Sequence, residues 1–333
     1  MLSRLILIFV AMALSGCVST VLDVDTKASQ PIPASLVADM KRRSMKPSDP
    51  IVVRIFKQES ELEIWKRDRN GKYALLKTYP MCRWSGKLGP KKRNGDRQAP
   101  EGFYTVSANM LNPKSKYYLS FDLGYPNRLE EALGYSGEAL MVHGACSSSG
   151  CYALTDDGVA EIYAVVRDAL KGGQRSFQVQ AFPFRMTPQN MAKNRNDPNY
   201  AFWQNIKVGY DLFEVTRQPP QVGYCGGGYA FQSKPLQSFP TDPMAACPAT
   251  ELTTDPLIAS KQQADERKVQ ALVERGVSAS AYAYSDGGMH PVFRKMLESG
   301  GPDKLARKTS KTKVPVSRPD AALADPHSAV SAN

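Results

Sequence analysis

Histidine is scarce in this sequence, with only three among 333 residues, and no internal repeat is present. Two of the three, His290 and His327, fall in an expected loop and an expected tail, so a zinc site with four ligands is hard to assemble. No metal and no cofactor is predicted. Beyond the first 17 residues no stretch is long and apolar enough to span a membrane. The hydrophobic fraction of 42% is enough for one sizeable core and predicts a globular protein.

The first 17 residues have the pattern of an export signal. A short basic start at 1–4 precedes a ten-residue apolar run at 5–14, and small residues at 15–17 form a cleavage site that ends in Cys17. This ending resembles the bacterial lipobox, in which the cysteine is acylated and becomes the mature N-terminus; the alternative is a plain secretory signal with a chance cysteine. We expect a periplasmic, lipid-anchored protein, and Val18 after the cysteine favours the outer membrane.

Export places the cysteines in an oxidising compartment, where they are first interpreted as disulfides. Apart from Cys17, five remain: Cys82, Cys146, Cys151, Cys225 and Cys247. An odd count leaves one thiol over, which is the first indication of a reactive cysteine. The other four allow three pairings, and the favoured pair is Cys225 with Cys247.

The pattern of residues along the chain predicts an α+β fold. Residues 18–50 are polar and rich in proline, as in a linker, and 187–299 are expected to form a helical and loop extension, with 220–255 as loop. A disordered basic tail is expected over 300–333, where a surplus of positive residues supplies part of the net charge of +11. In between, 51–186 form a β-rich catalytic domain. Its expected strands are 51–56, 62–66, 73–79, 103–107, 117–121, 139–143 and 176–182.

Three helices are predicted from apolar periodicity. The first follows Thr155 as N-cap and ends at two glycines, 172–173. The others cover 199–213 and 262–276.

The stretch 141–155 carries the predicted chemistry. A strand delivers His143, a loop rich in Gly and Ser follows, and Cys151 lies just ahead of the expected helix. A helix N-terminus and a nearby imidazole both lower the pKa of a thiol, which makes it nucleophilic. Gly150 lets the backbone approach a substrate carbonyl, so the amides of Gly150 and Cys151 are candidates for an oxyanion hole. This pattern indicates a thiol acyl-transfer site.

Other interpretations of the same residues stay open at this point. Cys146 and Cys151 could form a local disulfide, or could ligate zinc together with His143. On the residues alone, a reactive thiol and a structural disulfide are evenly balanced. Asp96 and Glu101 lie in a turn and favour structural roles over glycosidase chemistry. Nucleic acid is not expected as a partner, because the protein is exported.

The stretch 141–155 resembles the active-site motif of the YkuD-type L,D-transpeptidases, and 95–104 resembles that family's Pro-x-Gly turn entering a strand. The resemblance covers about 51–186 and continues in 183–187 and 209–211, which resemble the YafK-like branch of the family. It implies a mixed β-rich sandwich or barrel with a packed helix. It also implies Cys151 as the nucleophile and His143 as the general base, with Gly144, Ser149 and Gly150 as candidate substrate or oxyanion contacts.

Two departures limit what this resemblance carries over. Ser149 stands where the family usually has the His of Ser-His-Gly-Cys, and residues 152–153 replace a segment that commonly bears an arginine. Substrate contacts therefore cannot be copied from typical members. Cys146 either pairs with Cys82 or shapes the loop, and the disulfide is slightly favoured.

The implied reaction is attack of Cys151 on the diaminopimelate carbonyl of a peptidoglycan stem peptide, giving a thioacyl-enzyme. An incoming amine would form a 3-3 crosslink or attach a wall-linked lipoprotein, whereas water would make the enzyme a hydrolase. The YafK-like branch includes a hydrolase that releases such a lipoprotein, so hydrolysis is the alternative. A non-catalytic wall-binding lipoprotein with Cys151 in a disulfide is an alternative of another class.

Overall fold

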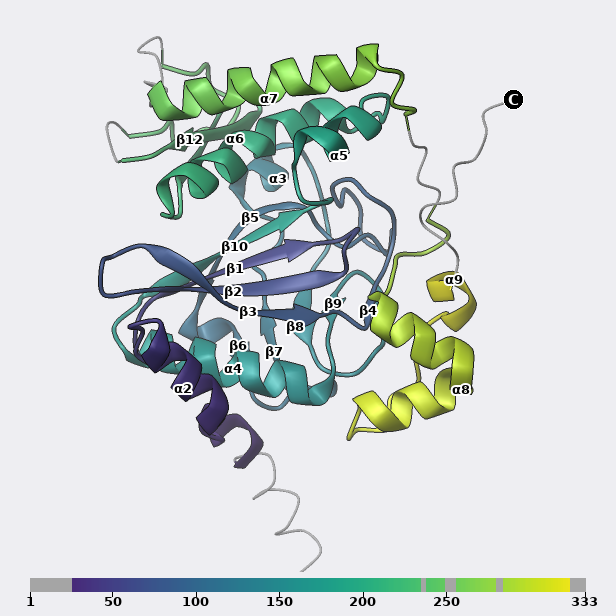
Figure 1. The fold of residues 1–333 in the computed structure, drawn as a ribbon. Helices are drawn as coiled ribbons and strands as arrows, with labels where there is room; N and C mark the ends of the chain where they lie inside the picture. The colour runs from purple at the N-terminus through teal and green to yellow at the C-terminus, as the bar shows by residue number, and fades with distance from the viewer. Residues whose placement is uncertain (1–25, 235–237, 249–255, 280–283, 324–333) are drawn as a thin grey trace, which may run out of the picture.

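The computed structural model describes residues 26–234, 238–248, 256–279 and 284–323, in two five-stranded sheets, a hairpin and surrounding helices (Figure 1). The signal segment and Cys17 lie outside the described residues. The first sheet has the order β3-β2-β1-β10-β5, formed by β1 (Ile51–Phe56), β2 (Glu61–Arg67), β3 (Tyr73–Pro80), β5 (Gly102–Ser107) and β10 (Ser176–Phe182). The second has the order β4-β9-β8-β7-β6, formed by β4 (Arg83–Trp84), β6 (Leu111–Asn112), β7 (Ser120–Asp122), β8 (Met141–His143) and β9 (Tyr152–Ala153).

The core lies between the two sheets. Phe121 of β7 meets Phe177 of β10 edge-on, with ring centroids 5.6 Å apart. Helix α4 (Asp156–Lys171) packs on β7 and β8. The Thr155 side chain caps it, accepting a hydrogen bond from the Gly158 amide at 2.9 Å. The α+β expectation is confirmed, as are the predicted helix and its cap.

The other face of the first sheet is covered by α6 (Tyr200–Thr216), so every residue of β1 is buried. Arg54 of β1 points into this layer, where it pairs with Glu214 at 2.6 Å and lies over the rings of Tyr210 and Phe213. Helix α7 (Pro256–Glu274) lies above α6, and α5 (Pro188–Lys193) lies beside α6 and packs against α7 (Figure 1). A short α3 (Arg128–Ala132) lies between them and the sheet.

The expectation of loop over 220–255 is wrong for its first part. Residues there form a hairpin of β11 (Gln221–Cys225) and β12 (Gly228–Gln232), and the predicted disulfide between Cys225 and Cys247 is confirmed. The alternation of Val222, Tyr224 and Phe231 with small residues supports the pairing, because aromatic and branched side chains suit strands.

The expectation of a linker over 18–50 is wrong for residues 26–50. Helix α2 (Ala34–Arg42) packs against the body through a set of buried apolar side chains, which are Ile32, Leu36, Met40 and Met45. Leu36 and Met40 are four residues apart and therefore lie on one helix face. The segment is part of the folded body.

The expectation of a disordered tail is wrong for residues 300–323. Helices α8 (Pro291–Thr309) and α9 (Pro319–Leu323) fold against the side of the second sheet (Figure 1). Leu297, Leu305 and Val316 are buried there in one cluster with Cys82 and Cys146. Apolar residues dispersed among the lysines make this contact. The prediction of disorder failed because it was based on the overall composition of the segment and not on the positions of these residues.

Candidate active site

Three short strands of the second sheet build the site through their register. Phe121, Val142 and Tyr152 are neighbours across β7, β8 and β9, and all three are buried in the core. Because side chains alternate along a strand, the residues on either side of this row point to the opposite face. Those residues are Ser120, His143 and Ala153 in one row, and Asp122 and Met141 in the next.

Cys151 lies one residue before β9 and extends the second of these rows. The Met141 amide donates a hydrogen bond to Cys151 Sγ at 3.4 Å, in agreement with that register. The thiol and the imidazole of His143 therefore share one face of the sheet, in adjacent rows. Among the contacts of the described residues, no hydrogen bond joins the two groups, and such contacts are often loose without substrate.

His143 is held in one orientation by its own chain. Its side chain is almost fully buried, and Nδ1 lies 2.5 Å from the carbonyl oxygen of Gly144. A carbonyl can only accept, so Nδ1 carries the proton and Nε2 keeps its lone pair. The ring of Tyr117 packs on the imidazole with centroids 4.6 Å apart. Burial lowers the pKa of His143 to about 4, so the ring is neutral at pH 7 and can accept a proton.

Cys151 is the free cysteine of the part of the chain that is described. Its thiol is partly exposed and lies 3.6 Å from the Ala139 carbonyl. Burial raises the pKa of Cys151 and the charge of Asp122 adds to this rise, whereas the Met141 amide and the charge of Lys91 oppose it. The expected helix N-terminus does not adjoin the thiol, because β9 intervenes and α4 begins only at Asp156. Thiol and base are thus both neutral at rest.

Residues 144–150, called here the Cys151 loop, are fixed at several points. The Cys82–Cys146 disulfide ties the loop to β4, which confirms the favoured pairing. Asp156 accepts a hydrogen bond from the Ala145 amide at 2.9 Å. Since Cys146 is bonded to Cys82, both the local disulfide with Cys151 and the zinc interpretation are wrong. The premise of the non-catalytic alternative, a bonded Cys151, also fails.

The other predicted site residues have partners within the protein. The Gly144 amide donates to the Tyr117 carbonyl at 3.0 Å, and the Gly150 amide donates to Ser148 Oγ at 3.3 Å. Ser149 Oγ accepts a hydrogen bond from Arg97 at 2.5 Å. Gly150 has a φ of +131°, and a Cβ there would lie 3.0 Å from a Leu140 methyl group, so glycine is required. Their contact with substrate stays a prediction.

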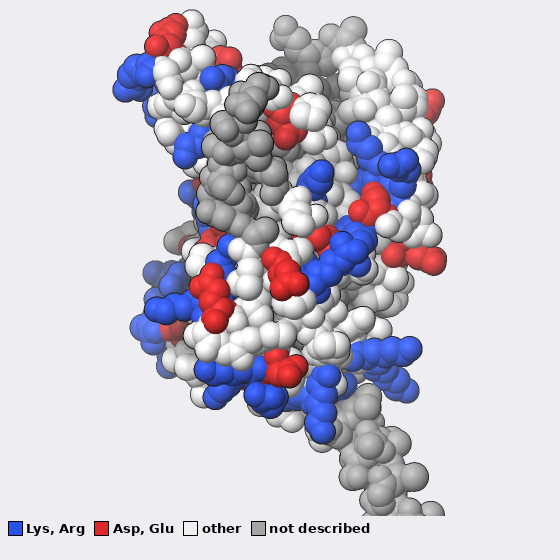
Figure 2. Space-filling model, turned by 90° about the vertical axis from the view of Figure 1, so that its right-hand side faces the viewer, with Lys and Arg blue, Asp and Glu red and all other residues white. Residues whose placement is uncertain are grey.

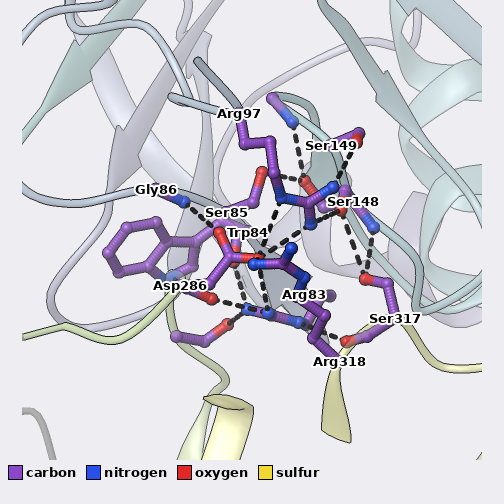
Figure 3. A network of polar contacts seen from close by, with 12 residues as sticks. Arg83, Trp84, Ser85, Gly86, Arg97, Ser148, Ser149, Asp286, Ser317 and Arg318 are labelled. Atoms are coloured by element: carbon purple, nitrogen blue, oxygen red, sulfur yellow. Dashed lines mark hydrogen bonds and ion pairs between the residues drawn. The ribbon is translucent and has the colours of Figure 1, made fainter. Parts of the chain in front are cut away.

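A network of ion pairs and hydrogen bonds lies against the Cys151 loop (Figure 3). Asp286, from the C-terminal extension, pairs with Arg97 at 2.8 Å, and also with Arg318 at 3.3 Å and buried Arg83 at 3.8 Å. Arg97 in turn donates to the Ser148 carbonyl at 3.0 Å. This network was not predicted from the sequence, because Arg97 and Asp286 are 189 residues apart and no motif links them.

Among the residues that the structure describes, no group of three or more His, Cys, Asp or Glu side chains is arranged to hold a metal ion. Within the same ranges, no helix has the length and apolarity needed to cross a membrane.

A free thiol and a neutral, oriented imidazole on one sheet face are the components of a cysteine acyl-transfer site. The comparisons with known proteins agree with that class. The catalytic-domain model of the L,D-transpeptidases (YkuD) matches residues 50–172. The chain is 42% identical over 243 residues to a protein of Escherichia coli K12 named "Putative L,D-transpeptidase YafK", and the match covers 73% of this chain and 96% of the relative. The chain belongs to the YkuD L,D-transpeptidase family.

Two solved structures are more distant. The helical cell shape determining protein Pgp2 of Campylobacter jejuni is 16% identical, with a TM-score of 0.33 over 57% of this chain and 80% of that one. Bd1075 of Bdellovibrio bacteriovorus is 14% identical, with a TM-score of 0.29 over 52% and 76%. The family assignment does not depend on either.

Proposed function

We propose that this protein is a peptidoglycan-modifying L,D-transpeptidase that uses Cys151 as nucleophile and His143 as general base. The observation that carries the proposal is the shared sheet face of a free thiol and an imidazole whose Nδ1 is held by the Gly144 carbonyl. That arrangement leaves Nε2 as the basic atom of the ring. Membership of the family supports the stem peptides of peptidoglycan as the substrate.

The reaction begins with transfer of the thiol proton from Cys151 to Nε2 of His143. The sulfur attacks the diaminopimelate carbonyl carbon, and the carbonyl electrons move to oxygen. When the tetrahedral species collapses, the carbon–nitrogen bond breaks and the leaving amine takes the proton from the imidazolium. A thioester on Cys151 remains. An acceptor amine, from a second stem peptide or from a lipoprotein, then displaces the sulfur and returns the proton through His143.

Cys151 and His143 are both neutral in the free protein. Burial disfavours the thiolate and the imidazolium alike, so proton transfer to His143 accompanies the attack of the sulfur, as negative charge moves to the carbonyl oxygen. The base must therefore be close to the thiol in the complex. This predicts that His143 is required for the first step rather than only for the second.

The test is mass spectrometry of muropeptides. Purified protein of residues 18–333 and its Cys151→Ala variant would be incubated with sacculi that carry bound lipoprotein. Cys151-dependent 3-3 crosslinks or exchanged terminal residues are expected. Loss of lipoprotein remnants without crosslinks would replace the transferase by a hydrolase on the same machinery. Identical products from both proteins would remove the catalytic proposal.

We also propose that the protein is a periplasmic lipoprotein anchored through Cys17 to the outer membrane. The support is the signal pattern together with the distribution of charge. Basic side chains gather at the lower end of the face in Figure 2, which is the end where α2 and the start of the described chain lie in Figure 1. The exposed Lys41, Arg42 and Arg43 of that region would face anionic lipid. Labelling with a fatty acid is expected for the full chain and lost in Cys17→Ser; label retained in the variant would contradict the proposal.

A further inference from the structure

Asp122 lies in the same row as the thiol. It is paired with Met141 across β7 and β8, and Met141 contacts Cys151 in turn. Two strand spacings separate the Asp122 and Cys151 backbones, which is about 10 Å. All three side chains of the row are partly exposed, whereas His143 in the next row is buried. The open part of the face thus has a thiol at one side and a carboxyl at the other.

Several buried or partly buried carboxylates of this protein are paired with a cation, and Asp122 is not among them. Four such pairs are Asp96 with Lys91, Glu101 with Lys57, Asp211 with Lys207 and Asp286 with Arg97. Asp122 accepts one hydrogen bond, from the Gly124 amide at 2.7 Å to Oδ1. In the described part of the chain, no Lys, Arg or His lies within ion-pair distance of it. A half-buried carboxylate without a cation is unfavourable, so a bound cation would be stabilised here.

The substrate proposed above supplies such a cation. Diaminopimelate carries a free ammonium at the far end of its side chain, and in extended form this nitrogen lies about 7 Å from the carbonyl that Cys151 would attack. Adding one hydrogen bond gives about the separation of the Cys151 and Asp122 backbones. We propose that Asp122 binds the side-chain ammonium of the donor diaminopimelate and thereby selects stem peptides that carry it. This inference rests on the proposed function and names the specificity residue of the same site.

The position of Asp122 also couples binding to reactivity. Its negative charge opposes ionisation of Cys151 in the free protein. The distal carbon of diaminopimelate carries an ammonium and a carboxylate, so an ammonium in direct contact with Asp122 offsets part of that charge and makes the thiolate easier to form once the correct substrate is in place. Removal of the carboxylate should therefore have two opposite effects: faster alkylation of the free thiol, and slower turnover of the substrate.

The test compares two tetrapeptide donors, one with diaminopimelate and one with 2-aminopimelate, in which hydrogen replaces the distal amino group. The protein of residues 18–333 is expected to prefer the first by about 10- to 100-fold in kcat/KM. Asp122→Asn should reduce this preference to near one and raise the rate of iodoacetamide alkylation at Cys151. Glu138→Gln removes an exposed carboxylate next to Ala139 and serves as the matched control, expected to keep the preference.

Each result decides the matter. If Asp122→Asn keeps the preference for the diaminopimelate donor, or if only Glu138→Gln loses it, the inference is wrong. Turnover that depends on Cys151 would still support the proposed function in that case. Absence of any Cys151-dependent turnover would overturn both. If Asp122→Asn is inactive, the same preference is measured as a ratio of Kd values in a Cys151→Ala background, and an unchanged ratio there contradicts the inference.

Discussion

Two disulfides stabilise different parts of this protein, and only one of them holds the Cys151 loop. Cys82 and Cys146 tie that loop to the second sheet, whereas Cys225 and Cys247 close the β11–β12 hairpin region. The perturbation is to replace each pair by alanine. The Cys82→Ala/Cys146→Ala variant should lose stability and activity, and the Cys225→Ala/Cys247→Ala variant should lose stability alone.

The magnitudes follow from the sequence separations of 64 and 22 residues. In the chain-entropy treatment a closed loop of the first size stabilises the folded state by about 4 kcal/mol and one of the second size by about 3 kcal/mol. The two variants are therefore close in stability. Their difference in activity then reports on the position of the Cys151 loop, where a shift of 1 Å can cost about 100-fold in rate.

The assay is urea unfolding of both variants, followed by kcat/KM for stem-peptide turnover under conditions where each remains folded. We expect comparable losses of unfolding free energy, and a fall in kcat/KM of about 10- to 100-fold only when Cys82 and Cys146 are replaced. Equal activities in the two variants would refute the reasoning, since the loop would then keep its position without its disulfide.

Two further predictions concern the charges of the site. Asp286→Ala leaves the guanidinium of Arg83, whose side chain is fully buried, without its carboxylate and should lower the free energy of unfolding by about 3–5 kcal/mol, measured by urea denaturation. A loss below about 1 kcal/mol, the usual range of exposed pairs, would show that the network of Figure 3 is not formed. Because burial raises the pKa of Cys151 and lowers that of His143 to about 4, alkylation of the thiol should increase with pH and have its midpoint above the ordinary value of about 8.5. A plateau of reactivity between pH 6 and 8 would instead reveal a preformed thiolate–imidazolium pair.

The sequence predicted those features that local patterns determine. The odd cysteine count identified a spare thiol, and the structure leaves Cys151 free while pairing the other four described cysteines as expected. Strands β1 to β3 were found from apolar runs bounded by turn residues, and the cap at Thr155 from its position before acidic residues.

Features that depend on distant contacts were not predicted. The two-residue strand β9 is too short to leave a periodic signal, so Cys151 was expected to adjoin the helix. Leu305 stands among charged residues and Leu36 follows a stretch rich in proline, and the burial of both depends on surfaces supplied by other parts of the chain. Asp122 lies in the same row as Cys151 because of the register of three strands, and no single stretch of sequence determines that register.

The central claim is that Cys151 forms a thioester with the stem peptide. The most direct test is mass spectrometry of residues 18–333, first as the intact protein and then after tryptic digestion, following brief incubation with a tetrapeptide donor and an acid quench. The account predicts an added acyl mass on the tryptic peptide that contains Cys151, absent in Cys151→Ala and removed by hydroxylamine. Turnover of the donor with no adduct, or an adduct on another residue, would contradict it.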